Sequence, residues 1–307
     1  MNQELTLGVL VFNQGKFVDA LLKSIARQIQ TDTPLLIIDN GSSDNSVEKL
    51  KLGFEIYGLL DRVTFLQNQS NTGSAAGLLQ LLENSQTPFL AVIHGDDMLE
   101  ETYTDNVLKY IAISKNFAAL NVTLKTLTSS NFPKSEENFY KPLWTRSKLI
   151  NRLLVCGLNP GVMPGSILNR DFILSRRLLH FTEKVNGVED TLLWMRIIRS
   201  GGEILTIKKP CYWYRIHESQ FSFQDSRNSF YFGFARKFVI RESRNRLESL
   251  LSRSEIAYEI KRFGFNSRYL EGLGDQYLKF SWFFSLFRIF NILLRRATQL
   301  FLRLDQR

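Results

Sequence analysis

Short apolar runs that alternate with stretches of helical spacing constrain the fold of this chain more than any other feature. The runs are rich in Leu, Ile, Val and Phe, and they cover residues 6–12, 35–38, 63–66 and 89–93. Between the first two runs, apolar residues recur at intervals of three and four over residues 17–30. Continuous apolar runs indicate strands buried on both faces, and alternation with helices predicts right-handed crossovers. We therefore predict an α/β fold, with a mostly parallel central sheet flanked by helices.

Polar residues follow these runs, and the carboxyl ends of parallel strands are where open α/β sheets bind ligands. We expect this geometry to bring Asn13, Asp39 and Asp96 together at one edge of the sheet. The fourth run ends in two adjacent carboxylates, Asp96 and Asp97, which repel each other unless a cation or hydrogen-bond donors hold them. A divalent metal that carries a diphosphate would supply both, whereas the alternative is a solvated turn.

The net charge of +9 is concentrated at the C-terminal end of the chain. Residues 1–226 hold 23 Lys/Arg and 23 Asp/Glu, and residues 227–307 hold 16 and 7. At about 100° per residue, the arginines of residues 278–307 fall on one arc of a helix, and Trp, Phe and Leu fill the remainder. Such a helix suits an anionic membrane surface. Packing on the rest of the chain, or on a second copy in a homo-oligomer, is the alternative; we expect no nucleic acid partner, because no recognised binding fold is evident.

Two cysteines, Cys156 and Cys211, are too few for a disulfide framework and fit a reducing compartment. The first residues carry no basic and apolar leader, and no run reaches the 18 or more apolar residues of a spanning helix. We expect a cytoplasmic protein that lies peripherally at the inner face of the cell membrane.

Several segments, taken in order, resemble the family 2 glycosyltransferases, which have the A-type glycosyltransferase fold. Residues 9–13 (Val-Leu-Val-Phe-Asn) resemble the end of the family's first strand. The other matching segments are Leu-Ile-Ile-Asp-Asn-Gly-Ser-Ser-Asp at 36–44, Asn-Thr-Gly at 71–73, His-Gly-Asp-Asp at 94–97, Gly-Val-Glu-Asp at 187–190 and Tyr-Arg-Ile-His at 214–217. The match covers roughly the first 220 residues. Three departures are Asn40, where the family usually has a second aspartate, the lack of an arginine after Gly73, and His94, which replaces a common aspartate upstream of Asp96 and Asp97.

The resemblance implies a metal-dependent site with named roles. Asp97 and His217 would bind Mg²⁺ or Mn²⁺, and Asp96 would face the ribose and the metal. A metal neutralises the charge that develops on a diphosphate leaving group. Asp190 would be the general base that deprotonates the acceptor hydroxyl, although a carboxylate there also suits the first turn of a helix.

The resemblance also implies a site for a nucleoside-diphosphate sugar, most often a UDP-sugar. Asp39 would accept a hydrogen bond from the nucleobase, although an Asx-type turn is the alternative. The remaining donor-binding residues implied by the match are Val11, Phe12, Asn13, Asn71 and Gly73.

Together these features predict a function class and a domain division. Residues 1–222 would form the catalytic domain, with a donor half (1–98) and an acceptor half (99–222), and residues 223–307 would form the basic helical region. We expect an inverting glycosyltransferase whose acceptor is a glycan or a lipid-linked molecule in bacterial polysaccharide or glycolipid assembly. The alternatives are a sugar-phosphate nucleotidyltransferase and a nucleotide-sugar-binding protein without turnover.

Overall fold

The computed structural model describes residues 3–29, 32–128, 139–140, 142, 144, 151, 161–181, 189–220, 289, 292–293 and 296–297. The chain divides into two compact units that interleave along the sequence. The first unit comprises Met1–Pro142, Val162–Lys184 and Ser200–His217, and the second comprises Leu143–Gly161, Val185–Arg199 and Glu218–Arg307. Among the residues described, no helix is long and apolar enough to cross a membrane.

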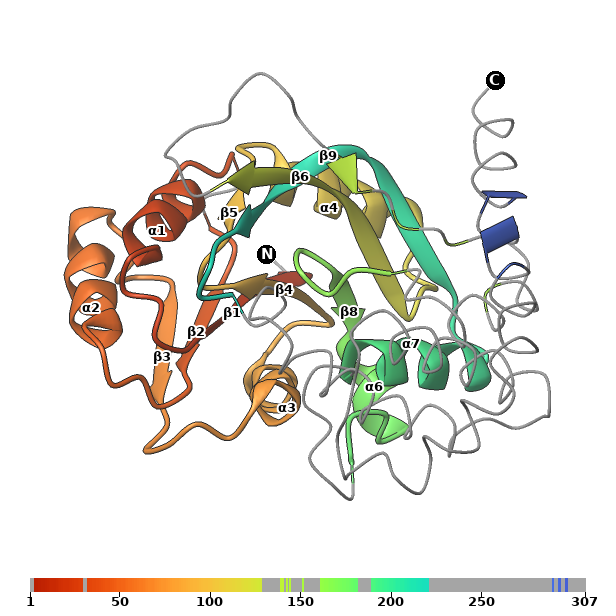
Figure 1. Cartoon of the computed structure of the whole chain (residues 1–307), viewed down its shortest axis with the longest axis horizontal. Helices are drawn as coiled ribbons and strands as arrows, with labels where there is room; N and C mark the ends of the chain where they lie inside the picture. Colours follow the sequence, from red (N-terminus) through yellow and green to blue (C-terminus); the bar gives the residue numbers. More distant parts are fainter. Residues whose placement is uncertain are drawn as a thin grey trace. The chain divides into compact units, whose positions relative to one another are not determined.

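The first unit contains a nine-stranded sheet, with strand order β3-β2-β1-β4-β8-β6-β9-β5 and with β7 paired to β6 (Figure 1). The strands are β1 (Leu5–Val11), β2 (Leu35–Asp39), β3 (Val63–Gln67), β4 (Phe89–His94), β5 (Met98–Leu99), β6 (Ala119–Thr128), β7 (Phe139–Tyr140), β8 (Ile167–Asn169) and β9 (Ile204–Ile216). The first four strands are parallel, as the sequence predicts. Their register aligns Val11 with Asp39 and Asp39 with Gln67, so their carboxyl ends share one edge.

Helices cover both faces of the parallel strands. The helices of the first unit are α1 (Val18–Ala26), α2 (Ser46–Ile56), α3 (Ser74–Asn84), α4 (Tyr103–Ile113) and α6 (Arg170–Ser175). Alternate strand residues such as Leu7, Val9 and Ile37 join a buried core with apolar residues of α1, α2 and α4. On the other face, α3 approaches Leu10 so closely that a Cβ at Gly77 would lie 2.7 Å from its Cδ1. The predicted arrangement of a sheet flanked by helices is confirmed.

The second half of the sheet is mixed, which the sequence does not predict. Strand β8 is antiparallel to both β4 and β6, whereas β6 and β9 are parallel. The two residues of β5 pair antiparallel with β9, and this pairing carries β9 past the carboxyl end of β4. Figure 1 shows β6 and β9 as long neighbouring strands beside α4. The consequence for function is that a late segment of the chain lies against the acidic turn after β4.

The second unit contains α7 (Glu189–Arg199), which carries the predicted base Asp190 in its first turn. Apart from Thr191, the buried residues of this helix are apolar, and Trp194 is fully buried with its ring centroid 6.1 Å from that of Trp144. Of the predicted basic helical region, the described residues 289, 292–293 and 296–297 are helical and exposed. The rest of that prediction, and the boundary at residue 222, lie outside the described residues.

Candidate active site

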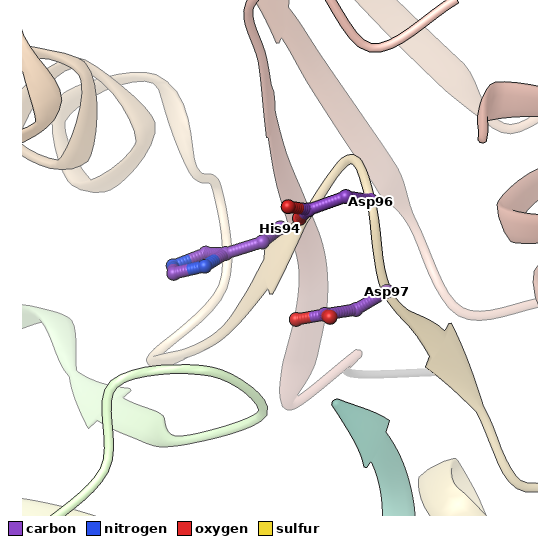
Figure 2. A group of neighbouring side chains, drawn as sticks. All are labelled: His94, Asp96 and Asp97. Atoms are coloured by element: carbon purple, nitrogen blue, oxygen red, sulfur yellow. The ribbon is translucent and has the colours of Figure 1, made fainter. Parts of the chain in front are cut away.

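The site begins with the acidic turn that ends β4. Asp96 and Asp97 are buried, and one carboxylate oxygen of each lies within 4.8 Å of a ring nitrogen of His94 and of the other. Figure 2 shows the three side chains extending to the same side of the turn. Because adjacent buried carboxylates repel each other, this arrangement needs donors or a cation to be stable.

Strand β9 supplies those donors to Asp97. The hydroxyl of Tyr212 donates to Oδ2 of Asp97 at 2.8 Å, and the backbone N–H of Arg215 donates to Oδ1 at 2.8 Å. Burial and the neighbouring Asp96 charge raise the pKa of Asp97 well above its usual value, although both hydrogen bonds oppose this shift. Asp97 thus joins the β4 turn to β9, with both of its oxygens engaged.

Asp96 meets a different partner, His217, which lies one residue beyond the end of β9. Its Oδ2 lies 3.0 Å from Nε2 of His217. Burial alone would raise the pKa of Asp96, but the hydrogen bond with His217 and the proximity of His94 outweigh it, so the pKa is lowered. Asp96 is therefore the more readily ionised carboxylate of the pair.

The donor set of this turn fits a divalent cation. Carboxylate oxygens suit Mg²⁺ and Mn²⁺, and an imidazole nitrogen is also a metal ligand. Two ligands at neighbouring positions of an octahedron, each about 2.1 Å from the ion, lie about 3.0 Å apart. The 3.0 Å between Asp96 Oδ2 and His217 Nε2 is a hydrogen-bond distance that is also close to that separation, so a cation bound by both atoms would replace this hydrogen bond. The predicted roles of Asp97 and His217 as metal ligands stay predictions.

Phe17, which precedes α1, packs against the side chains of Arg215 and His217. Its ring centroid lies 4.5 Å from that of His217, and the guanidinium carbon of Arg215 lies 5.0 Å from it. Arg215 also donates from Nε to the backbone oxygen of Asp96 at 2.7 Å. Sequence reasoning gave no role to Tyr212 or Phe17, and the only available signal was that Tyr212 shares a segment with Arg215 and His217.

The predicted nucleobase acceptor lies at the end of β2. Asp39 is fully buried, and its Oδ2 accepts from the backbone N–H of Ser42 at 3.1 Å. Its Oδ1 is buried and has no hydrogen-bond partner. A buried carboxylate oxygen without a donor is costly, and its predicted role as the nucleobase acceptor stays a prediction.

The loop after β1 is fixed by the turn after β2. Asn13 adopts a left-handed conformation (φ 52°), which asparagine tolerates better than most residues. Its Oδ1 accepts from the backbone N–H of Ser43 at 2.8 Å. Val11, the last residue of β1, is buried. Phe12, the next residue, is 40% exposed. An exposed aromatic ring at this edge is available for stacking.

The two remaining donor-loop residues lie between β3 and α3. Oδ1 of Asn71 accepts from the backbone N–H of Gly73 at 2.8 Å. Gly73 has φ 89°, which favours glycine, and the helix α3 begins at the next residue. The structure thus brings Asn13, Asp39, Asn71 and Gly73 to adjoining turns of the first unit.

Asp190 belongs to the second unit. Its Oδ1 accepts from the backbone N–H of Thr191 at 2.6 Å and from the Thr191 hydroxyl at 3.3 Å. These contacts orient the carboxylate in the first turn of α7, where the helix dipole favours negative charge. Its role as general base stays a prediction.

The model of the family described as "Glycosyl transferase family 2" matches residues 6–177, and this chain belongs to that family. EpsH of Bacillus subtilis (strain 168), which is named as a glycosyltransferase, is 24% identical over 225 residues. That match covers 70% of this chain and 61% of EpsH, so the chain spans less than two thirds of that relative.

Two solved structures share the fold. S. aureus TarS 1-349 in complex with UDP-GlcNAc has a TM-score of 0.62 at 15% identity, over 98% of this chain and 92% of the other. The mannosyltransferase PcManGT from Pyrobaculum calidifontis, in complex with GDP-Man and Mn²⁺, also has a TM-score of 0.62, at 13% identity over 97% and 86%. The A-type glycosyltransferase fold implied by the sequence is confirmed.

Proposed function

We propose that this chain transfers a sugar from a nucleoside-diphosphate sugar to an acceptor hydroxyl, with a divalent cation at the acidic turn. The observation that carries the proposal is the cluster of His94, Asp96 and Asp97, whose possible ligand atoms lie within 4.8 Å of one another, with Nε2 of His217 3.0 Å from Oδ2 of Asp96. Asp96 and His217 would hold the cation, with Asp97 beside them. When bound, the cation neutralises the charge on the departing diphosphate.

The first test is whether the chain acts on nucleotide sugars at all. UDP-sugars and GDP-sugars are incubated with the protein in Mg²⁺ or Mn²⁺, and release of the nucleoside diphosphate is measured. Turnover that disappears with a chelator and returns with added metal supports the proposal. Asp96→Asn should weaken metal binding measured by calorimetry at least tenfold, because it removes the ionised ligand. Metal binding of normal strength in Asp96→Asn contradicts the assignment.

The nucleoside is proposed from the chemistry of Asp39. An ionised carboxylate only accepts hydrogen bonds, so its buried Oδ1 suits a base with a ring N–H. Uracil and guanine carry such a group, whereas adenine and cytosine present an unprotonated ring nitrogen. We favour uridine, and TarS and PcManGT are described with a UDP-sugar and a GDP-sugar respectively.

Asp190 is proposed as the base that takes the proton of the acceptor hydroxyl in an inverting transfer. General bases contribute about 10²- to 10⁴-fold to rates, so Asp190→Asn should lower kcat by at least about 100-fold and leave donor affinity within about twofold. The matched control is Asp171→Asn, which changes an exposed aspartate in the first turn of α6. If Asp190→Asn behaves like Asp171→Asn, Asp190 is not the base.

The acceptor is proposed from the C-terminal residues. Ile289, Ile292 and Leu293 are helical and 38–56% exposed, and Arg296, which is also helical, is exposed as well. Exposed aliphatic residues beside arginine suit an anionic lipid surface. We therefore propose a glycan or lipid-linked acceptor that the enzyme meets at a membrane, as in assembly of bacterial surface polysaccharides.

A further inference from the structure

A buried amide, Asn40, is the centre of the hydrogen-bond network that joins β2 to the loop at residues 68–73. Asn40 is 2% exposed, whereas Ser70, Asn71 and Thr72 of the loop are exposed. A loop that lies in solvent on one side has few apolar contacts to fix it. Its conformation therefore depends on what its polar groups bind underneath.

The oxygen of the Asn40 side chain accepts three hydrogen bonds from this loop. The donors are Nδ2 of Asn68 at 3.0 Å, the backbone N–H of Thr72 at 3.2 Å and the Thr72 hydroxyl at 2.9 Å. Asn68 is itself held by a reciprocal amide pair with Gln80 of α3, at 2.9 and 3.0 Å. The network thus extends from β2 through the loop to the helix that follows it.

The nitrogen of the same side chain donates in the opposite direction. Nδ2 of Asn40 lies 3.1 Å from Oδ1 of Asn71 and 3.4 Å from the backbone oxygen of Gly73. An amide can accept and donate at once, whereas a carboxylate can only accept. An aspartate at this position could still accept the three hydrogen bonds from Asn68 and Thr72. Its second oxygen would take the place of Nδ2, where it would face the oxygens of Asn71 and Gly73 without a hydrogen bond.

The backbone of the loop lies directly against the turn that follows Asn40. A Cβ at Gly41 would lie 2.5 Å from the carbonyl carbon of Ser70 and 2.8 Å from the backbone nitrogen of Asn71. Asp39, one residue earlier, accepts through its backbone oxygen from the N–H of Asn68 at 2.8 Å. The loop is therefore held beside the residue that carries the buried, unpartnered Oδ1.

We propose that Asn40 is a positioning residue of the donor site, whose buried amide holds residues 68–73 in the conformation that receives the nucleotide sugar. The inference rests on the proposed function. Because Asn40 acts through the loop, its loss changes how tightly the donor binds more than how fast bound donor reacts.

The test compares Asn40→Ala and Asn40→Asp with the wild-type protein by two independent readouts. The first is hydrogen–deuterium exchange of the peptide that covers residues 68–73. The second is the KM and kcat for the donor that the wild-type protein accepts. Asn40→Ala should raise exchange in that peptide and raise KM about tenfold, with kcat within about threefold. For Asn40→Asp, the exchange of this peptide and the KM should lie between the values for Asn40→Ala and for the wild-type protein. The reason is that three of the five hydrogen bonds of the Asn40 side chain can persist.

The matched control is Thr87→Ala, which removes a buried side chain at the opposite end of the parallel strands. Its Oγ1 lies 2.7 Å from Oγ1 of Thr6 and donates to the backbone oxygen of Phe89 at 2.8 Å. Thr87→Ala should lower Tm without raising exchange at residues 68–73 and without raising KM. If it raises both as Asn40→Ala does, general destabilisation explains the effect and the inference is overturned.

The readouts separate failure of this inference from failure of the proposed function. Unchanged exchange in Asn40→Ala shows that Asn40 does not hold the loop, whatever the chain binds. Raised exchange with an unchanged KM shows that the loop does not receive the donor. If the wild-type protein neither binds nor turns over nucleotide sugars, the proposed function fails and so does the donor part of this inference, and exchange alone then decides whether Asn40 holds the loop.

Discussion

The replacement Asp39→Asn should have opposite effects on ligand affinity and on stability. The native side chain is fully buried, with Oδ2 accepting from Ser42 and Oδ1 without a partner. An asparagine is nearly the same size and can still accept from Ser42 through its oxygen. Its NH₂ group then takes the position of Oδ1, where it opposes the ring N–H of a nucleobase instead of accepting from it.

The size of the effect follows from the charge of the acceptor. A hydrogen bond to a charged group contributes about 1.5–3 kcal/mol, which corresponds to about 10- to 150-fold in Kd. Nucleoside diphosphate affinity should therefore fall by that factor. The free protein, by contrast, no longer buries a charged oxygen without a donor, so its Tm should be unchanged or higher.

Isothermal titration calorimetry with UDP, GDP and ADP, combined with thermal unfolding of the free protein, measures both effects. UDP or GDP should bind more tightly than ADP to the wild-type protein, and Asp39→Asn should remove that preference. A variant with lower Tm and unchanged affinity would refute the reasoning, because it would mean that Asp39 serves only the turn that follows β2.

Three further predictions concern other parts of the chain. Burial raises the pKa of the Cys211 thiol to about 12, so at pH 8 the native protein should leave this residue unlabelled by iodoacetamide, and mass spectrometry of the peptide should detect labelling only after unfolding. In urea denaturation, Gly41→Ala should lower the free energy of unfolding more than Gly58→Ala. Both glycines have a positive φ, which costs other residues about 1–2 kcal/mol, but of the two only Gly41 has backbone atoms close to an added Cβ. Equal losses in the two variants would contradict this prediction. A variant ending at Asp275 should lose co-sedimentation with anionic liposomes, and unchanged binding would exclude the C-terminal helix as the membrane contact.

The parallel half of the fold is readable from local patterns. Its strands are short, mainly apolar runs that end in polar residues, and the parallel register aligns the end of β1 at Val11 with the end of β2 at Asp39. The mixed half is not readable in that way. Strand β9 carries charged and aromatic residues, and its pairing with β5 and β6 depends on contacts between segments about a hundred residues apart.

The candidate site divides along the same line. Asp39 and Asp96 follow directly from the positions at which apolar runs end. The engagement of Asp97 by Tyr212 joins residues 115 positions apart, and no local pattern indicates it. The Asn40 network is also hidden in the sequence, because an Asn-Gly pair predicts a turn whether or not its amide is buried.

The acidic turn of β4 depends on a strand that the ribosome makes much later. Asp96 and His217 are separated by 121 positions, and at about 5–20 residues per second the partner emerges many seconds after the turn itself. Until β9 is synthesised, Asp97 lacks the hydrogen bonds from Tyr212 and Arg215. The repulsion between the Asp96 and Asp97 carboxylates is then not offset by these donors. The closure of this long loop therefore makes assembly of the acidic turn a late event during synthesis, and a nascent chain that stops before β9 has no means of completing it.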